Sequence, residues 1–449
     1  MKFRKFGKAL LLGALSAGVV FGITSCIQSY TVGFLYVTGI KTAQTTNNGI
    51  ISGFKIEHNT GRLTPIAGLP VGSGGANPAR AILLSGGRFL YVLNTGQTAS
   101  GGSNCTAADP CSGGNITQFS IGGNGVLEPQ QTFYTQGINP RRILADASGN
   151  FLYVLDQEAP DSASCALALG QGVTSCGDIT AFKVDPTTGR LSLLLNAQVT
   201  SANGAQLSYF PVPANPIDFV LTSGDILTLS GTPATGDSVF PYTYGLSTGQ
   251  LTVTQNGSQT LGIHQATAIV GTGPVYVLDN EGTLVSNGAT SQILPYSVGS
   301  NGALQAMTGG AVADDPAQSN PIYLIVEAPG NKWVYVANQG NNLDPNNAQS
   351  GIVGYVIDPA THVLSELAGG GFPSSPGTGG VVGTGAGPQC LLEDPSNQYI
   401  YTANFNDSTV TGRLIDQNSG VLTNLSGKAN AAFPLDGPAL WCVVTGRTS

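Results

Sequence analysis

The side chains best able to do chemistry in this chain follow a repeated phrase. Only 9% of its 449 residues are charged, so polar residues in equivalent positions are noticeable. Arg80 and Arg142 each stand two residues after the proline of an Asn-Pro phrase, and Asp218 has that place in the next copy. Arginine recognises carboxylates and phosphates through paired N–H donors. We therefore expect a ligand-binding set for an anion, with simple pairing of Arg and Asp as the alternative. Its members are Arg80, Arg141, Arg142, Asp218 and Gln265.

His264, in the sequence GIHQA, is the candidate catalytic residue. Its imidazole can act as a general base on a water molecule, and a nearby arginine can stabilise a developing oxyanion. The alternative is a structural histidine at the start of a strand. His58 and His362 fall in hairpins expected at the opposite face, so we assign them no role in this chemistry.

These residues must be positioned by a repeated unit, whose clearest copy runs from Asn139 to Leu195. It holds four short runs rich in Ile, Val, Leu, Phe and Tyr, bounded by Gly, Pro, Asp and Asn, which is typical of strands. Gly149 and Gly189 supply the positive φ that tight hairpins require. One copy therefore predicts a four-stranded antiparallel meander over Arg142–Asp146, Phe151–Leu155, Ile179–Val184 and Leu191–Leu195.

The unit recurs along the chain. An apolar residue followed by Tyr-Val and Asn, Asp or Gly appears at several places, and a strand closed by a Gly turn and then Leu or Val appears in phrases such as ITAFKVDPTTGRL. Four-stranded units with two apolar faces must stack on one another. The fold class expected is all-β, a seven-bladed β-propeller. The Tyr-Val phrases are at Tyr36, Tyr91, Tyr153, Tyr276, Tyr335 and Tyr401, with a degraded form at Ile226–Leu229.

Closure of the ring is predicted from both ends of the chain. The first copy begins at Phe34 with its second strand, and GPALWCVVT, from Gly437 to Thr445, matches an opening strand with nothing after it. We expect the C-terminal strand to pair with Phe34–Thr38 as the innermost strand of the first blade.

Long links fall mainly after the second and fourth strands of the copies. In a meander, both kinds of link lie at the same edge of the sheet. This predicts one elaborated face and one plain face. Loops on a rigid scaffold often carry binding sites, although solvated Gly/Ser/Asn filler is the alternative for any single loop. The long links are Gly96–Asn115, Gln157–Gly177, Ala197–Asn215, Gln339–Gly351 and Gly369–Gly387.

The N-terminus has the pattern of an export signal. Basic residues precede an apolar run from Ala9 to Ile23, and Ile-Thr-Ser-Cys follows. The pattern predicts a bacterial lipoprotein signal over residues 1–25, lipidation of Cys26, a tether over 26–33 and one propeller domain over 34–449. The expected location is the cell envelope, lipid-anchored at the outer membrane or facing the periplasm. An ordinary signal peptide or a membrane-anchoring helix is the alternative.

The cysteines support export. Of the seven, six remain without Cys26, and an even number in an exported chain suggests disulfides. The expected pairs are Cys105 with Cys111, Cys165 with Cys176, and Cys390 with Cys442, whereas buried free thiols are the alternative for the last pair. Without a CxxC pair or a Cys/His cluster, we expect no metal and no cofactor.

The formal net charge of −8 argues against a nucleic-acid partner. We expect membrane association only through the lipid, a monomer, and a small molecule or a cell-envelope protein as partner. The sequence contains neither the zincin motif HExxH nor the phosphate-binding motif GxxxxGK.

The Tyr-Val phrase and the Asp-Pro…Thr-Gly…Leu hairpin resemble the seven-bladed lactonase-like propellers, which include bacterial 6-phosphogluconolactonase and fungal carboxymuconate cyclase. In that family activity is linked to Pro-His-Pro-His and Asp-Leu-Gly phrases. Asp156 and Asp279 match the latter aspartate, but Gln157 and Asn280 follow them. Counting back from each Tyr-Val, the second histidine falls on Ala79, Arg141, Ile217, His264 and Gln389, of which only His264 keeps the imidazole.

Two hypotheses follow from the sequence. The first is an exported propeller that binds a small anionic ligand, such as a sugar acid or a lactone, or a partner, through its elaborated face and central channel. The second, implied by the resemblance, is a sugar-lactone hydrolase, a carboxylic ester hydrolase.

Overall fold

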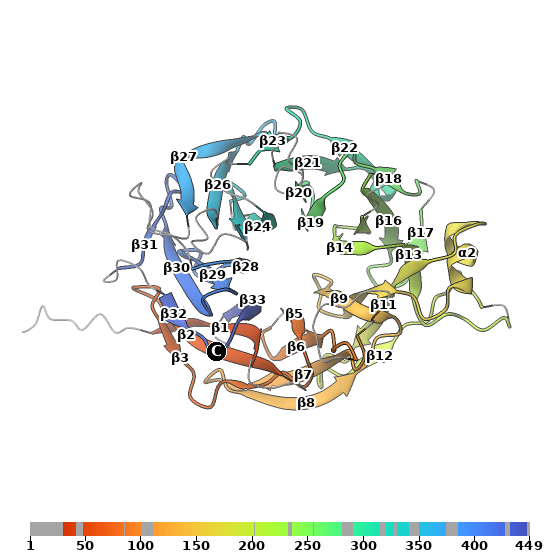
Figure 1. The fold of residues 1–449 in the computed structure, drawn as a ribbon, viewed down its shortest axis with the longest axis horizontal. Coiled ribbons are helices and arrows are strands. Elements are labelled where there is room, and N and C mark those ends of the chain that lie inside the picture. The colour runs from red at the N-terminus through yellow and green to blue at the C-terminus, as the bar shows by residue number, and fades with distance from the viewer. Residues whose placement is uncertain are drawn as a thin grey trace, which may run out of the picture.

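The computed structural model is a ring of seven antiparallel sheets around a central channel, and so confirms the predicted fold class (Figure 1). The structure describes residues 30–41, 48–84, 86–99, 109, 111–201, 203–231, 236–254, 256–280, 291–314, 320–326, 330–340, 350–373, 385–426 and 432–446. The account below is of these residues. Among them, no helix is long and apolar enough to cross a bilayer.

Each blade runs from an inner strand at the channel to an outer strand at the rim. Blade 1 consists of β33 (Ala439–Gly446), β1 (Thr31–Ile40), β2 (Gly49–Glu57), β3 (Leu63–Pro65) and β4 (Val71–Gly72). Blade 2 consists of β5 (Pro78–Leu83), β6 (Phe89–Asn94), β7 (Asn115–Ile121) and β8 (Leu127–Phe133). Blade 3 consists of β9 (Ile138–Ala145), β10 (Phe151–Glu158), β11 (Cys176–Val184), β12 (Leu191–Leu193) and β13 (Phe210–Pro213).

The remaining blades follow the same order around the ring. Blades 4 to 7 are β14 (Pro216–Leu221), β15 (Asp225–Ser230), β16 (Ser238–Tyr244), β17 (Leu251–Val253) and β18 (Gln259–Thr260); β19 (Ala266–Gly271), β20 (Val275–Asp279), β21 (Gln292–Val298), β22 (Leu304–Ala306) and β23 (Val312–Ala313); β24 (Pro321–Val326), β25 (Trp333–Asn338), β26 (Gly351–Ile357) and β27 (Leu364–Pro373); and β28 (Pro388–Glu393), β29 (Tyr399–Asn404), β30 (Thr409–Ile415), β31 (Leu422–Asn424) and β32 (Ala432–Pro434). A short 3-10 helix, η1 (Ser300–Gly302), joins β21 to β22.

Ring closure occurs as predicted. β33 pairs antiparallel with β1, with Phe34 opposite Thr445 and Thr38 opposite Trp441. β1 begins at Thr31, earlier than the expected Phe34. Because the two ends of the chain complete one blade, β33 covers the inner edge of β1.

The predicted four-stranded blades are confirmed, with one addition at the rim. In five blades the outer strand is broken in two, and both halves pair with the third strand; in blade 1, for example, β3 and β4 both pair with β2. The sequence from Ala197 to Asn215, expected to be a link after the fourth strand, therefore contains β13, the second half of an outer strand. Likewise β27 extends to Pro373, into the expected loop Gly369–Gly387.

The elaborated face is the one at which the second strand of a blade turns into the third, and three of the long links do lie there. The link of blade 3 contains the helix α2 (Ala163–Leu169), which projects at the rim (Figure 1). It is tied by the predicted disulfide Cys165–Cys176. The opposite, plain face carries the tight turns between first and second strands and between third and fourth strands.

The two repeated phrases bind one another across blade boundaries. At five junctions the hydroxyl of the Tyr-Val tyrosine donates to the carbonyl of the turn glycine in the next blade. This bond explains why both phrases recur, because each blade supplies one half of it. The pairs are Tyr36 with Gly125, Tyr91 with Gly189, Tyr153 with Gly249, Tyr335 with Gly420 and Tyr401 with Gly61.

The Cys390–Cys442 disulfide joins the inner strands of blades 7 and 1, as predicted, with Cα atoms 5.9 Å apart. Cys111 is buried and disulfide-bonded, whereas its expected partner Cys105 lies outside the described residues. Cys26 and the signal segment also lie outside them.

Candidate functional site

A β-bulge at the start of every inner strand places one residue of each blade at the same level of the channel. The register shifts near the start of each of these strands, for example between Pro78 and Arg80 and between Pro140 and Arg142. A bulge leaves one residue unpaired and redirects the next side chain. The seven equivalent residues are Arg80, Arg142, Asp218, Ala268, Tyr323, Cys390 and Trp441.

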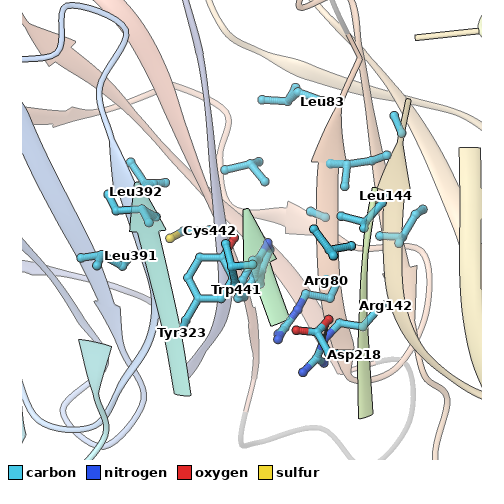
Figure 2. Close-up of a pocket in the computed structure, with 18 of the residues that line it drawn as sticks. Arg80, Leu83, Arg142, Leu144, Asp218, Tyr323, Leu391, Leu392, Trp441 and Cys442 are labelled. Carbon is cyan, nitrogen blue, oxygen red and sulfur yellow. Dashed lines mark hydrogen bonds and ion pairs between the residues drawn. The ribbon is translucent and has the colours of Figure 1, made fainter. Parts of the chain in front are cut away.

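Three of the five residues of the predicted polar set, Arg80, Arg142 and Asp218, lie at this level and line a channel cavity of about 580 Å³. Figure 2 shows Arg80 and Arg142 converging on Asp218. Arg142 Nε donates to Asp218 Oδ1 over 2.9 Å. Asp218 also accepts hydrogen bonds from the backbone N–H groups of Phe219 (3.0 Å) and Ile269 (3.2 Å). Its carboxylate is therefore occupied by structural partners.

Arg80 has no ion-pair partner among the described residues. Its guanidinium carbon stands 3.6 Å above the centre of the Trp441 ring, and Tyr323 meets that indole edge to face at 4.8 Å. Burial, and then the charge of Arg142, lower the pKa of Arg80 well below its usual range, while Asp218 opposes this. Two arginines against one aspartate leave an excess positive charge in a partly buried place, which a bound anion would neutralise.

The rest of the channel wall is mainly apolar. Leucine, isoleucine, valine and alanine side chains of the inner strands line it, including Leu83, Leu144, Val220 and Leu392. Asp146 and Glu393 are the other acidic groups of the wall, and none of its described residues is Ser, Thr, Asn or Gln. Anion recognition in the channel is therefore confined to the level of the arginines.

A second cavity, of about 490 Å³, opens at the elaborated face beside blades 3 to 5. It brings His264 and Gln265 together with Arg141 and Arg142, so Arg142 lines both cavities, whereas Arg80 lines only the channel. Arg141 donates from Nε (3.2 Å) and Nη2 (2.7 Å) to the Gln157 side-chain oxygen. This mouth cavity offers hydrogen-bond donors and acceptors that the channel lacks.

The register corrects one alignment made by counting residues. His264 is not the equivalent of Arg141, because the link from Gly271 to Val275 is shorter than its counterparts; Thr267 has that place in blade 5. His264 precedes β19 and is exposed. Asp237 holds the start of β19 in place, because its Oδ2 accepts a hydrogen bond from the backbone N–H of Ala266 over 2.6 Å.

Sequence reasoning missed Trp441, Tyr323 and Gln157 as site residues. The signal for the first two was their position two residues after the start of an inner strand, and for Gln157 its place directly after the Tyr-Val-x-Asp phrase. No cluster of three or more His, Cys, Asp or Glu side chains suited to a metal occurs in the part of the chain that the structure describes.

Comparison with known proteins supports the resemblance. Residues 46–208 match the family model described as lactonase, 7-bladed beta-propeller. The periplasmic gluconolactonase of Pseudomonas aeruginosa is similar in structure, with a TM-score of 0.60 and 15% identity over 92% of this chain and 99% of that one. A Bacteroides fragilis structure whose name proposes a 6-phosphogluconolactonase gives 0.60 and 15% over 92% and 98%. No curated protein sequence matches. These likenesses confirm a lactonase-like propeller fold.

Proposed function

We propose that this propeller binds a small organic anion, of the sugar-acid or lactone-derived class, where the channel meets the mouth cavity. The observation that carries the proposal is Arg80, a partly buried cation that stacks on Trp441 and forms no ion pair with a carboxylate of the described residues. Arg142 stands beside it with one guanidinium nitrogen engaged by Asp218. Concave sites with a few convergent polar groups are where ligands usually bind.

The mouth cavity supplies the part of the site that a hydroxylated anion needs. A carboxylate between the two arginines lies next to Arg141, Gln157 and Gln265, whose amide and guanidinium groups suit sugar hydroxyls. The channel beyond Arg80 is mainly apolar, and its acidic groups Asp146 and Glu393 would repel an anion. The ligand is therefore expected to enter from the elaborated face.

Calorimetry with gluconate, 6-phosphogluconate and their lactones tests this proposal. Arg80→Gln is expected to weaken binding roughly tenfold or more, because it removes charge-assisted hydrogen bonds. Arg88→Gln is the matched control, since Arg88 is exposed and packs on Phe89 in a plain-face turn. Absence of binding to the wild type, or equal binding by the Arg80 variant, would refute the channel site.

Lactone hydrolysis is the second candidate function. It is favoured by one arrangement, the presence of His264, Arg141 and Arg142 around a single cavity, and by the names of the similar structures. If the protein turns over lactones, His264→Ala should lower kcat/KM at least about 100-fold, since general-base catalysis contributes that much. His58→Ala, in a hairpin of blade 1 where His58 stacks on Tyr30, is the control. Equal rates for His264→Ala and the wild type would exclude His264 as the general base, and absence of hydrolysis by the wild type would leave binding as the function.

We also propose export to the cell envelope with a lipid on Cys26. The two disulfides Cys165–Cys176 and Cys390–Cys442 fit an oxidising compartment. The sequence before Cys26 fits a lipoprotein signal.

A further inference from the structure

The channel continues from the arginines to the plain face as one mainly apolar passage. A second cavity, of about 710 Å³, opens among plain-face turns at Gly273, Asn331 and His362. It shares seven lining residues with the channel cavity, including Leu144 and Ile325, so the two cavities are adjacent parts of the same space. Each of them alone has a volume within the range of small-molecule sites.

The aliphatic side chains of this passage are not fully covered by the fold. Leu144, Val270 and Ile325 belong to inner strands and line both cavities, yet each of them is only half-buried. Aliphatic surface that remains in contact with water favours the binding of an apolar group, because the bound group removes that surface from water. The passage therefore suits an apolar ligand or the apolar part of a larger one.

The charged side chains of the passage lie at its elaborated-face end and on one side of it. Arg80 and Arg142 are at the elaborated-face end, whereas Asp146 and Glu393 are at the plain-face ends of the inner strands of blades 3 and 7. Asp146 is engaged in its own turn, where it accepts a hydrogen bond from the backbone N–H of Phe151 over 2.8 Å. Among its described lining residues, the plain-face cavity has no Asp, Glu, Lys or Arg. An uncharged chain can therefore extend from the arginines toward blades 4 to 6.

We propose that the passage binds a carboxylate that carries an aliphatic chain, such as a medium-chain alkanoic acid. The carboxylate lies at Arg80 and Arg142, and the chain runs along the apolar wall into the plain-face cavity. Figure 2 shows Leu83 and Leu144 above the two arginines, where the chain begins. The inference rests on the proposed anion site, because it uses the same arginines. It adds a ligand class whose chain fills the space that a sugar acid leaves to water.

Calorimetric titration with butanoate, hexanoate and octanoate tests the proposal, with gluconate as the reference for the anion site alone. We expect the affinity to rise on the order of tenfold for each added pair of methylene groups, since each pair buries more apolar surface. Gluconate should compete with octanoate, because both anions need the arginines. For the same reason Arg80→Gln should weaken the binding of both, roughly tenfold or more.

A variant of the wall separates the chain from the carboxylate. Val270→Thr with Ile325→Thr places hydroxyl groups along the passage, and we expect it to lower the affinity for octanoate about tenfold and leave gluconate binding unchanged. Unchanged gluconate binding also shows that the variant is folded. Should the pair not fold, Val270→Thr alone should lower the affinity for octanoate about threefold. The matched control, Leu193→Thr with Leu246→Thr, alters two exposed leucines at the rim and should change neither affinity.

The outcomes distinguish this inference from the proposed function. If gluconate binds but the affinity does not rise from butanoate to octanoate, the inference is overturned and the proposed function stands. If octanoate binds as expected and gluconate does not, the passage is confirmed and the sugar-acid class is wrong. Equal octanoate binding by Arg80→Gln and the wild type would overturn the inference, as would full octanoate affinity in the wall variant. Absence of binding by all four anions would overturn both proposals.

Discussion

Asp156 and Asp178 stand directly opposite each other on β10 and β11, and both side chains are fully buried. The Thr180 hydroxyl lies between them, 3.1 Å from Asp156 Oδ2 and 3.3 Å from Asp178 Oδ1. Burial raises the pKa of Asp156 to about 7, although hydrogen bonds from Thr135 and Thr180 oppose it. Burial and then the charge of Asp156 raise the pKa of Asp178 well above its usual range. The folded protein therefore holds protons on this pair that the unfolded chain releases.

The stability of the protein should fall as the pH rises from about 4 to 7. A folded-state pKa above the unfolded value means that the folded state binds more protons in this window, so deprotonation destabilises it, by up to about 1.4 kcal/mol per pH unit for each extra proton. Asp178→Asn should flatten this decline, because the amide remains neutral. Thermal melting across pH 4 to 8 measures it, with Asp185→Asn in an exposed turn of the same blade as control. A steady gain in stability over that range would contradict the assignment.

The blade pattern could be predicted from sequence because strands and tight turns are encoded locally, and the orphan strand at each end implied closure. The depth at which a side chain lies in the channel could not be predicted from sequence, because it depends on the length of the link that follows each inner strand. Because the link before Val275 is short, residue counting aligned His264 with Arg141, whose structural equivalent in blade 5, Thr267, lies three positions further along the chain. The stacking of Arg80 on Trp441 was hidden for a related reason, since these residues lie at opposite ends of the chain and meet only when the ring closes.

Removal of the Cys390–Cys442 bridge should destabilise the ring closure. The bridge encloses a separation of 52 residues, which corresponds to about 4 kcal/mol in the chain-entropy model. The double variant Cys390→Ala/Cys442→Ala should therefore melt well below the wild type. Reduction should shift the melting temperature of the wild type more than that of the variant, which keeps the Cys165–Cys176 bridge. Cys165→Ala/Cys176→Ala, with a separation of 11, should cost only roughly 3 kcal/mol. An equal or larger effect of the local bridge would argue against this order.

Truncation after Asp436 should prevent correct folding. It removes β33, which pairs with β1 over its whole length, and exposes an open edge in blade 1. We expect aggregation or loss of the cooperative melting transition. A truncated protein that melts like the full chain would show that the closure strand is dispensable.

Cys26→Ser should release the protein from the membrane fraction or block its processing, because the proposed lipid is attached to that thiol. Cell fractionation and the mass of the N-terminal peptide measure this, with Cys165→Ser as a control that alters a disulfide cysteine instead. Unchanged fractionation and unchanged mass would rule out lipidation.

Asp218→Asn should separate the contribution of the polar set to stability from its contribution to anion binding. Asp218 neutralises Arg142 and accepts two backbone N–H bonds, so replacing its buried carboxylate should destabilise the protein by about 3 kcal/mol or more. The same change removes the only carboxylate at the level of Arg80 and Arg142 and frees a guanidinium edge. Anion affinity should therefore increase while the melting temperature falls, both measurable on one sample by calorimetry with gluconate. Since a bound anion would take the place of Asp218 beside the arginines, gluconate should also stabilise the variant more than it stabilises the wild type. Weaker binding by a folded Asp218→Asn variant would mean that the aspartate positions the arginines for the ligand and does not compete with it.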